Sequence, residues 1–379
     1  NKNMEALSMK QRNPYSSKWN LMFNMNPNSD MTPLTVADME FDVADPIKDA
    51  LETFINTYPL VYSELTHSYQ EAVIDGFKNR HNITFAKNHM VQSTGVVSAL
   101  YALVEVLSQK GEGVLIQTPV YSQFMQVIKN TKRTIIDSPL VYDKGIYTID
   151  FDDLDKKLEH AKIMILCQPH NPVGRIFSRE ELEKIHALTT KHQVTVISDE
   201  VHADFTITKP FVSYFEVDPN AIICTGASKS FNLAALQTSN IFIPKQYTRD
   251  KFNERNNKLG VRNPNILGYI ATEAAYRDGA VWLDDKISII RSNFDYLKKS
   301  IQDTKLIISP LEGMYLAWIN YENYGLDEET FMKLLRDNDL YVSPGSSFGQ
   351  RGFFRVNLAA TFNVIERFTT VLLHVVEEI

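Results

Sequence analysis

Gly226-Ala227-Ser228-Lys229-Ser230-Phe231-Asn232 follows the apolar run Ala221-Ile222-Ile223-Cys224, which has the composition of a buried strand. The lysine of this stretch therefore lies just beyond a predicted strand end. Most lysines are solvated surface charges, but a neutral amine in this position can form a Schiff base with an aldehyde cofactor, and proteins use pyridoxal phosphate (PLP) in this way. Which interpretation of Lys229 holds depends on the residues that follow the neighbouring strands.

Short β-rich runs alternate with helix-length segments through the middle of the chain. This alternation is typical of an α/β fold in which helices cover both faces of a parallel sheet. Ser178-Arg179-Glu180-Glu181 matches a capping box and predicts a helix that ends near Lys191. In such sheets ligands bind beyond the carboxyl ends of the strands. The predicted strands span residues 114–117, 163–166, 194–197 and 221–224.

The last third of the chain has a different pattern. A long helical region is predicted over residues 265–301, and a further helix at the C-terminus. Between them, short strands are predicted at 305–308, 314–318 and 353–356, with a helix at 328–337. This succession predicts a smaller α+β domain. We therefore expect an N-terminal segment (1–45) that joins the small domain, a large PLP-binding domain (46–288) and a small C-terminal domain (289–379).

Composition limits the classes of function that the chain can have. It has 379 residues and a formal net charge of −7, and this charge argues against nucleic acid, whose phosphates require clustered Lys and Arg. The longest apolar runs, such as 371–376, are too short to cross a membrane, and residues 1–4 do not resemble a secretory signal. Cys167 and Cys224 fit buried thiols in a reducing compartment, so we expect a cytoplasmic location.

Polar side chains follow two of the predicted strands. Asp199 ends one strand, where a carboxylate can pair with a protonated pyridine nitrogen, although alone it would be an ordinary strand-terminating acid. Asn171 lies in the loop 168–175 after another strand and could donate a hydrogen bond to the phenolate oxygen of the cofactor. His202, three residues after Asp199, could do the same.

Two further features suit a phosphorylated aromatic cofactor. Ser93-Thr94-Gly95-Val96-Val97 precedes an apolar-periodic helix at 99–107, and a glycine at a helix start lets the amides of Gly95, Val96 and Val97 approach a phosphate. The same pattern also fits a plain capped helix. Tyr121 follows a strand and could stack on a pyridine ring, whereas an isolated aromatic would be a core residue.

These residues together resemble a known family. The stretches 170–175, 198–205 and 228–236 are similar to the fold-type I PLP enzymes of aminotransferase class I/II, and more closely to their MalY/PatB-like cystathionine β-lyase branch. The likeness begins at 17–20 and 36–41 and continues through 280–284 to 354–357. It implies the type I PLP-dependent transferase fold, with a mixed, mostly parallel sheet in the large domain and a smaller α+β domain.

The resemblance also implies a role for each of these residues. Lys229 would carry the cofactor, Asp199 would pair with its ring nitrogen, Asn171 would contact its phenolate oxygen and Tyr121 would stack on its ring. Arg355 would bind the carboxylate of the amino-acid substrate.

The phosphate site departs from the broader family pattern. Gln237 stands where many relatives have a phosphate-binding arginine, and Gly226 replaces a frequent serine. The resemblance leaves this work to Ser228, to the amides near Gly95 and to Tyr62 of the partner subunit, because 61–63 match a segment that family members lend to the partner's phosphate. It therefore implies a homodimer.

The implied activity is β-elimination from cystathionine-like amino acids, which yields thiol, pyruvate and ammonia. Transamination stays open, because both reactions begin with the same deprotonation at Cα. A non-catalytic regulatory protein with this fold is a third interpretation, which the presence of Lys229, Asp199 and Arg355 disfavours.

Other α/β classes fit the sequence less well. No Gly-x-Gly-x-x-Gly follows a strand, since Gly111-Glu112-Gly113 precedes one, which disfavours a nicotinamide dehydrogenase. A P-loop fails because Ala221 and Ser228 occupy its two glycine positions. No metal is expected, since the candidate ligands near His170 and His202 lie on separate loops without helical spacing.

Overall fold

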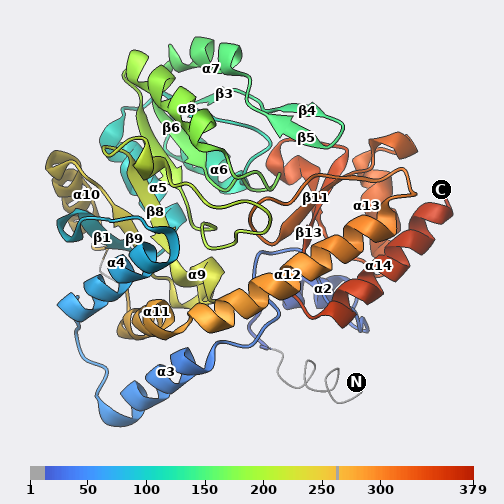
Figure 1. Cartoon of the computed structure of the whole chain (residues 1–379), viewed down its shortest axis with the longest axis horizontal. Coiled ribbons are helices and arrows are strands. Elements are labelled where there is room, and N and C mark those ends of the chain that lie inside the picture. The colour runs from blue at the N-terminus through green and yellow to red at the C-terminus, as the bar shows by residue number, and fades with distance from the viewer. Residues whose placement is uncertain (1–12, 262–263) are drawn as a thin grey trace.

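The computed structural model describes residues 13–261 and 264–379, so the expectation about residues 1–4 lies outside the described residues. A seven-stranded sheet in the order β1-β9-β8-β7-β6-β2-β3 forms the centre of the larger part of the molecule (Figure 1). β9 is antiparallel to both neighbours, and the other neighbouring pairs are parallel. This mixed, mostly parallel sheet confirms the predicted class. The strands are β1 (Met90–Ser93), β2 (Gly113–Ile116), β3 (Thr134–Asp137), β6 (Ala161–Cys167), β7 (Thr195–Asp199), β8 (Ile222–Gly226) and β9 (Ser239–Phe242).

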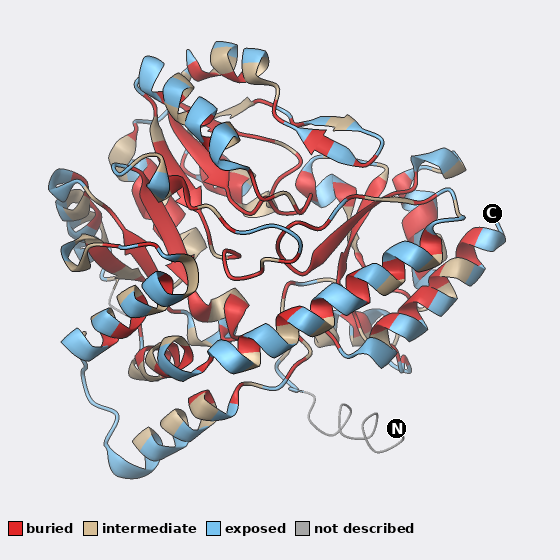
Figure 2. Cartoon of the chain, viewed as in Figure 1, coloured by how far each residue is buried: buried red, intermediate tan, exposed pale blue. Residues whose placement is uncertain are grey.

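Alternate residues of the central strands enter two hydrophobic clusters, one on each face of the sheet. Val114 and Ile163 belong to one cluster, and their chain neighbours Leu115 and Met164 belong to the other. This follows from the period of two in a strand. Figure 2 shows the sheet buried between helices whose outer surfaces are exposed. The first cluster includes residues of α5 (Val96–Leu107) and α6 (Ser122–Asn130), and the second includes residues of α4 (His67–His81), α7 (Phe151–Leu158) and α8 (Arg179–Lys191).

Helix boundaries follow local sequence signals. α8 begins at the predicted capping box, in which the Glu181 N–H donates to Ser178 Oγ at 3.2 Å and the Ser178 N–H donates to the Glu181 carboxylate at 3.0 Å. The predicted helical region 265–301 is divided into α11 (Ile266–Asp278) and α12 (Ala280–Ile301). Gly279 lies at the break, where the Phe231 ring approaches so closely that an added Cβ would overlap it.

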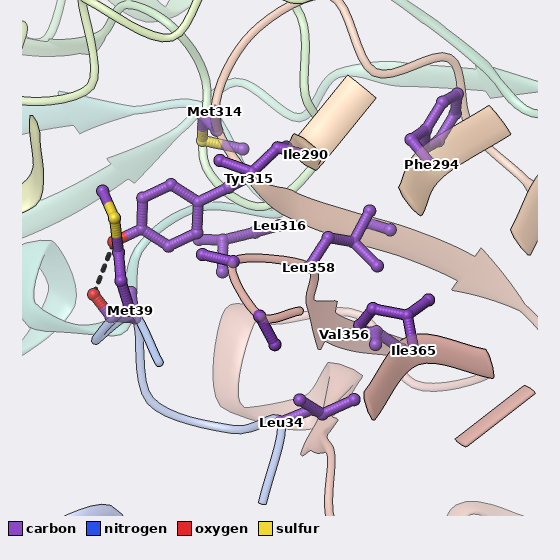
Figure 3. Packing of buried hydrophobic residues seen from close by; sticks show 14 of the residues in the cluster. Leu34, Met39, Ile290, Phe294, Met314, Tyr315, Leu316, Val356, Leu358 and Ile365 are labelled. Carbon is purple, nitrogen blue, oxygen red and sulfur yellow. Dashed lines mark hydrogen bonds between the residues drawn. The ribbon is translucent and has the colours of Figure 1, made fainter. Parts of the chain in front are cut away.

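A second, four-stranded antiparallel sheet lies beside the first, in the order β10-β11-β13-β12 (Figure 1). The N-terminal segment packs against it, because the Leu34 N–H donates to the Tyr341 carbonyl at 2.9 Å and the Asn357 N–H donates to the Leu34 carbonyl at 3.1 Å. Figure 3 shows Leu34 and Met39 in the cluster that contains Val356 of this sheet. The strands are β10 (Ile307–Ile308), β11 (Leu316–Asn320), β12 (Ser343–Pro344) and β13 (Phe353–Asn357).

The expected domain limit at 288/289 falls inside α12, and the division of the chain at 45/46 and 288/289 stays a prediction. None of the described helices combines the length and apolar character needed to cross a membrane.

The remaining elements surround the two sheets. They include α2 (Ser17–Met25), α3 (Asp45–Thr57), α9 (Ala227–Ser230), α10 (Gln246–Lys258), α13 (Glu328–Asp337), α14 (Phe362–Glu377) and the hairpin of β4 (Val141–Asp143) and β5 (Ile146–Thr148).

Candidate active site

The carboxyl ends of the parallel strands meet at one edge of the large sheet. Asp199 at the end of β7 is in register with Cys167 of β6 on one side and with Cys224 of β8 on the other. Lys229 follows β8 on the short helix α9, and Asn171 follows β6. The fold therefore gathers at one edge polar residues that are distant in sequence.

A cavity of about 770 Å³ opens at this edge. All of the predicted site residues except Tyr62 line it. The N-terminal segment, α2 and α13 complete its walls. The predicted residues in its lining are Gly95, Val96, Val97, Tyr121, Asn171, Asp199, His202, Ser228, Lys229 and Arg355.

Lys229 lies partly buried on the cavity side of α9. Its Nζ donates to the Ala37 carbonyl at 3.4 Å. Burial lowers the pKa of this amine, and the positive charges of Arg355 and Lys18 lower it further, against the opposing charges of Asp38 and Asp199. The environment thus raises the fraction of neutral amine, the form that acts as nucleophile or base.

Asp199 is only 5% exposed. Burial raises the pKa of its carboxyl to about 6, while the hydrogen bond from the Val201 N–H and the charge of Lys229 act in the other direction. A buried carboxylate of this kind is stabilised by a cationic partner. The protonated nitrogen of a pyridine ring would be such a partner.

Arg355 is a buried cation without an acidic partner among the described residues. Its Nη1 donates to Asn171 Oδ1 and its Nη2 to the Thr35 carbonyl, both at 3.1 Å. The guanidinium carbon lies 4.7 Å from the centroid of the Phe348 ring, and Nε has no partner. Burial lowers the pKa of this guanidinium to about 10. A desolvated guanidinium held by neutral groups is suited to bind an anionic ligand.

His202 and Tyr121 are aromatic residues whose pKa values are shifted so that the neutral form of each side chain is favoured. Burial holds the pKa of His202 well below its ordinary value, so its ring is neutral at neutral pH, and its Nδ1 has no partner. Burial raises the pKa of the Tyr121 phenol, and the charge of Asp199 adds to this effect. Both side chains can therefore act as neutral hydrogen-bonding groups in the cavity.

Gly95 begins α5 in a backbone conformation that suits glycine almost alone, with φ 158° and ψ 163°. The backbone conformation alone favours glycine here, because an added Cβ would meet nothing within 4 Å and the space beside Gly95 is open. The first amides of α5 therefore lie at the cavity, where the helix N-terminus favours an anion.

Ser239 is a cavity residue that the sequence analysis missed. It begins β9 and is in register with Gly226 of β8 and with Ser93 of β1. A Cβ added to Gly226 would lie 3.1 Å from Ser239 Oγ. Gln237, where relatives have an arginine, takes a left-handed conformation and is absent from the cavity lining. The apolar run Ile241-Phe242-Ile243 was a signal for this strand.

Residues 34–41, which we call the N-terminal strap, contribute Thr35, Val36 and Ala37 to the cavity lining, and no role for them was predicted from the sequence. The Ala37 carbonyl accepts a hydrogen bond from the Tyr315 hydroxyl at 2.5 Å, drawn as a dashed line in Figure 3. Asn357 Nδ2 donates to the Val36 carbonyl at 2.9 Å and to the Asp38 carbonyl at 2.7 Å. Side chains of the small domain thus fix the strap through its backbone.

Tyr62 lies outside the cavity of its own chain. It belongs to the segment between α3 and α4, and its side chain is fully exposed. Its neighbours Leu60 and Val61 are 66% and 65% exposed. The chain by itself does not bring Tyr62 to the other predicted residues.

The cavity fits PLP in each chemical part of that cofactor. Lys229 could supply an amine for the aldehyde, Asp199 a carboxylate for the ring nitrogen, and the start of α5 amides for the phosphate. Three buried polar atoms of lining residues have no hydrogen-bond partner. They are Thr35 Oγ1, His202 Nδ1 and Arg355 Nε. No group of three or more His, Cys, Asp or Glu among the described residues is arranged to hold a metal ion.

Comparisons with known proteins agree with this geometry. Residues 29–372 match the family model of aminotransferase class I and II. The chain is 33% identical to the cystathionine β-lyase PatB of Bacillus subtilis (strain 168) over 363 residues, which are 93% of this chain and 94% of PatB.

Two solved structures have the same fold over nearly their whole length. Cystalysin of Treponema denticola, which contains pyridoxal 5'-phosphate, superposes with a TM-score of 0.94 at 31% identity and 97% coverage of each chain. The PLP-bound C–S lyase of Staphylococcus hominis gives a TM-score of 0.90 at 28% identity and 96% coverage of each chain. The chain is therefore a PLP-dependent enzyme that belongs to the aminotransferase class I and II family.

Proposed function

We propose that this enzyme is a C–S β-lyase that acts on cystathionine-like amino acids. The observation that carries the proposal is the convergence on one cavity of Lys229, Asp199 and Arg355, whose guanidinium has no acidic partner among the described residues. The choice of β-elimination is supported by the full-length likeness to PatB and to the C–S lyase of Staphylococcus hominis.

The cofactor is assigned to the sheet-edge side of the cavity. When bound, PLP supplies an electron sink that stabilises negative charge at the Cα of the amino acid. We assign Asp199 to the ring nitrogen, Asn171 and His202 to the phenolate oxygen, and Tyr121 to the face of the ring. Ser228 and the amides of residues 95–97 are assigned to the phosphate, and Ser239 joins them through its position beside Gly226.

Lys229 acts as the base in this proposal. Its buried environment favours the neutral amine, so Nζ can take the proton from the substrate Cα. Departure of a thiolate from Cβ then completes the elimination, and the resulting enamine hydrolyses to pyruvate and ammonia.

Arg355 orients the substrate. Its guanidinium now donates to Asn171 and to the Thr35 carbonyl, both neutral acceptors, and a substrate carboxylate is a stronger partner for it. A carboxylate held there fixes one end of the amino acid relative to Lys229.

The outer wall of the cavity fits the thioether arm. Leu21 and Met25 of α2 and Met332 of α13 give the lining apolar surface, and Glu328, Glu329 and Arg336 of α13 add charges of both signs. An apolar arm with a charged tip matches such a wall. Cystathionine has this character, because its thioether ends in a second amino-acid group.

A direct assay separates elimination from transamination, which the family model keeps as the alternative activity. The enzyme is incubated with cystathionine while pyruvate and free thiol are measured, and in parallel with amino acids and keto acids while amino transfer is measured. Pyruvate formation in step with thiol supports the lyase. Amino transfer without thiol release would establish the alternative.

We also propose that the working unit is a homodimer in the reducing cytoplasm, with Tyr62 completing the phosphate site of the partner subunit. Its full exposure and its distance from its own cavity lining support this. Inactive Lys229→Ala is mixed with a severely impaired Tyr62 variant, and subunits are allowed to exchange. A mixed dimer then has one site with both changes and one with neither, so activity partly returns. Proven exchange without recovery would contradict the shared site.

A further inference from the structure

Lys229 lies on a helix that is too short to keep a fixed orientation without contacts from other segments. α9 has four residues, Ala227–Ser230, and a single helical turn is unstable without outside contacts. Ser228 and Lys229 line the cavity, whereas Ala227 and Ser230, three positions apart and hence on one face, are buried at 1% exposure each. The orientation of Lys229 therefore depends on what holds this buried face.

Ser230 makes a short hydrogen bond on that face. Its Oγ donates to Asp204 Oδ2 at 2.6 Å. Asp204 is 6% exposed and lies in the turn after β7, the same turn that carries His202 and begins beside Asp199. One buried side-chain bond thus joins α9 to the segment that presents the other proposed cofactor ligands.

The second oxygen of Asp204 is held by α4. His81 Nε2 lies 2.6 Å from Asp204 Oδ1, and Arg80 Nε lies 3.3 Å from the same atom. Burial works to raise the pKa of Asp204, but the hydrogen bond from His81 and the charges of His81 and Arg80 keep it below its ordinary value. The carboxylate is therefore ionised and fixed from two elements.

This network is separate from the proposed chemistry. Apart from burial, the charges that act most on Lys229 are those of Asp38, Arg355, Asp199 and Lys18. Asp204 and His81 line a second cavity, also about 770 Å³, which shares no lining residue with the first. The Ser230 hydroxyl is what connects Asp204 to the helix of Lys229.

We propose that the hydrogen bonds from Ser230 to Asp204 and between Asp204 and His81 position Lys229. They fix α9 against the turn after β7 and so set the place of the Lys229 amine relative to Asp199 and to the substrate Cα. Ser230 and Asp204 are positioning residues that touch neither cofactor nor substrate. The inference rests on the proposed role of Lys229 and is independent of whether the reaction is elimination or transamination.

The test compares two buried serines that make the same kind of bond. Ser230→Ala removes the donor to Asp204. Ser138→Ala is the matched control, because Ser138 is 2% exposed and its Oγ donates to Asp153 Oδ2 at 2.8 Å, and neither residue lines the active-site cavity. Ser230→Thr keeps a hydroxyl at the position. For each variant we would measure unfolding, kcat and KM of the PLP-loaded enzyme, and the rate at which acetic anhydride modifies Lys229 in the cofactor-free chain.

We expect Ser230→Ala to lower kcat about tenfold or more with KM within about twofold, because a small displacement of a reacting group costs rate rather than binding. The modification rate of Lys229 should change in the same variant, and Ser230→Thr should recover most of both values. Ser138→Ala should lose comparable stability and keep kcat and the modification rate. Equal kcat losses in the two alanine variants, or an unchanged Ser230→Ala, would overturn the proposal.

Two further arms keep the test decisive. If Ser230→Ala does not fold, Ser230→Cys keeps the volume with a weak donor, and full kcat in that variant would overturn the proposal. Borohydride trapping locates the lysine that holds the cofactor. Trapping at another lysine would refute the role of Lys229 itself, whereas trapping at Lys229 with normal Ser230→Ala kinetics would refute the positioning role alone.

Discussion

The inner and outer walls of the active-site cavity are built differently. The inner wall is formed by Asn171, Asp199 and His202 at strand ends and turns of the large sheet, by Lys229 on α9 and by Arg355 in β13. Asp199 and Arg355 are 5% and 6% exposed. The outer wall comes from α2 and α13, where Leu21 and Met25 are 53% and 51% exposed. Groups of the inner wall have shifted pKa values caused mainly by burial.

This difference suggests that the inner wall carries out the reaction steps and that the outer wall selects the substrate. The inner wall is fixed by sheet register and by buried hydrogen bonds, so its groups keep one geometry for the reaction steps. The outer wall carries exposed side chains such as Leu21 and Met25, and substitutions of exposed residues usually cost little stability. We therefore expect changes in the inner wall to affect rate strongly and changes in the outer wall to affect substrate preference.

The largest effect is expected from Lys229→Ala. Loss of the only base that we assign to the reaction should lower kcat by about 10⁴-fold or more and abolish the covalent cofactor link. Borohydride reduction followed by peptide mapping measures the link. Substantial turnover in this variant would show that the chemistry does not depend on the inner wall as described.

Asp199→Asn should fold and bind the cofactor but lose about 10²-fold or more in kcat, because a neutral amide cannot hold the ring nitrogen protonated. Wild-type kinetics would remove Asp199 from this role.

The same variant has a stability signature in the cofactor-free chain. Because the folded carboxyl has a pKa of about 6, above its unfolded value, its ionisation destabilises the fold, and stability rises as pH falls from about 6 toward 4. The gain relative to Asp199→Asn should be about 3 kcal/mol at most, measured by urea unfolding at several pH values. A parallel pH profile of the two proteins would contradict this assignment.

Arg355→Leu should raise KM for the amino acid about 10- to 100-fold, since a charge-assisted hydrogen bond to the carboxylate is lost. The kcat at saturation should fall less than in Asp199→Asn. Unchanged amino-acid binding would place the carboxylate site elsewhere.

The smallest effect is expected from Arg336→Gln in the outer wall. For cystathionine, kcat/KM should fall about two- to fivefold, because an exposed ion pair contributes little, while S-ethylcysteine, which lacks a charged tip, should be unaffected.

Lys333→Gln is the matched control for this change. It removes the same charge from α13, but Lys333 pairs with Asp337 at 2.7 Å and lies outside the cavity lining. Equal losses of kcat/KM for both substrates in Arg336→Gln, or the same losses in Lys333→Gln, would contradict the distinction between the two walls.

The sequence predicted the inner wall better than its surroundings for a physical reason. Lys229, Asp199 and Asn171 each follow an apolar run that forms a parallel strand, and the carboxyl ends of parallel strands meet at one edge. Ser239 was missed because it begins β9, which runs the opposite way and so brings its first residue to that edge. The strap is neither a helix nor a strand, so its sequence has no periodic pattern of apolar residues to detect. Side-chain hydrogen bonds from other segments hold its backbone instead.

The long helical region shows another limit. The break falls at Gly279, where the Phe231 ring leaves no room for a Cβ, and this contact with a distant part of the chain cannot be seen in the local sequence. Arg355 likewise entered through family resemblance, because nothing in its own strand distinguishes a buried cation.

The strap also governs when the enzyme can mature during synthesis. Its carbonyls at Thr35, Val36 and Asp38 bond to Arg355 and Asn357, at sequence separations of 319 to 321 residues. The ribosome must therefore synthesise Arg355 and Asn357 before the strap can make these hydrogen bonds. The cost of joining such distant segments grows only slowly with length, but the order of events is strict. The last strand of the large sheet is β9 (Ser239–Phe242), so that sheet can assemble early, but the strap is fixed at the active-site cavity only after β13 has been made.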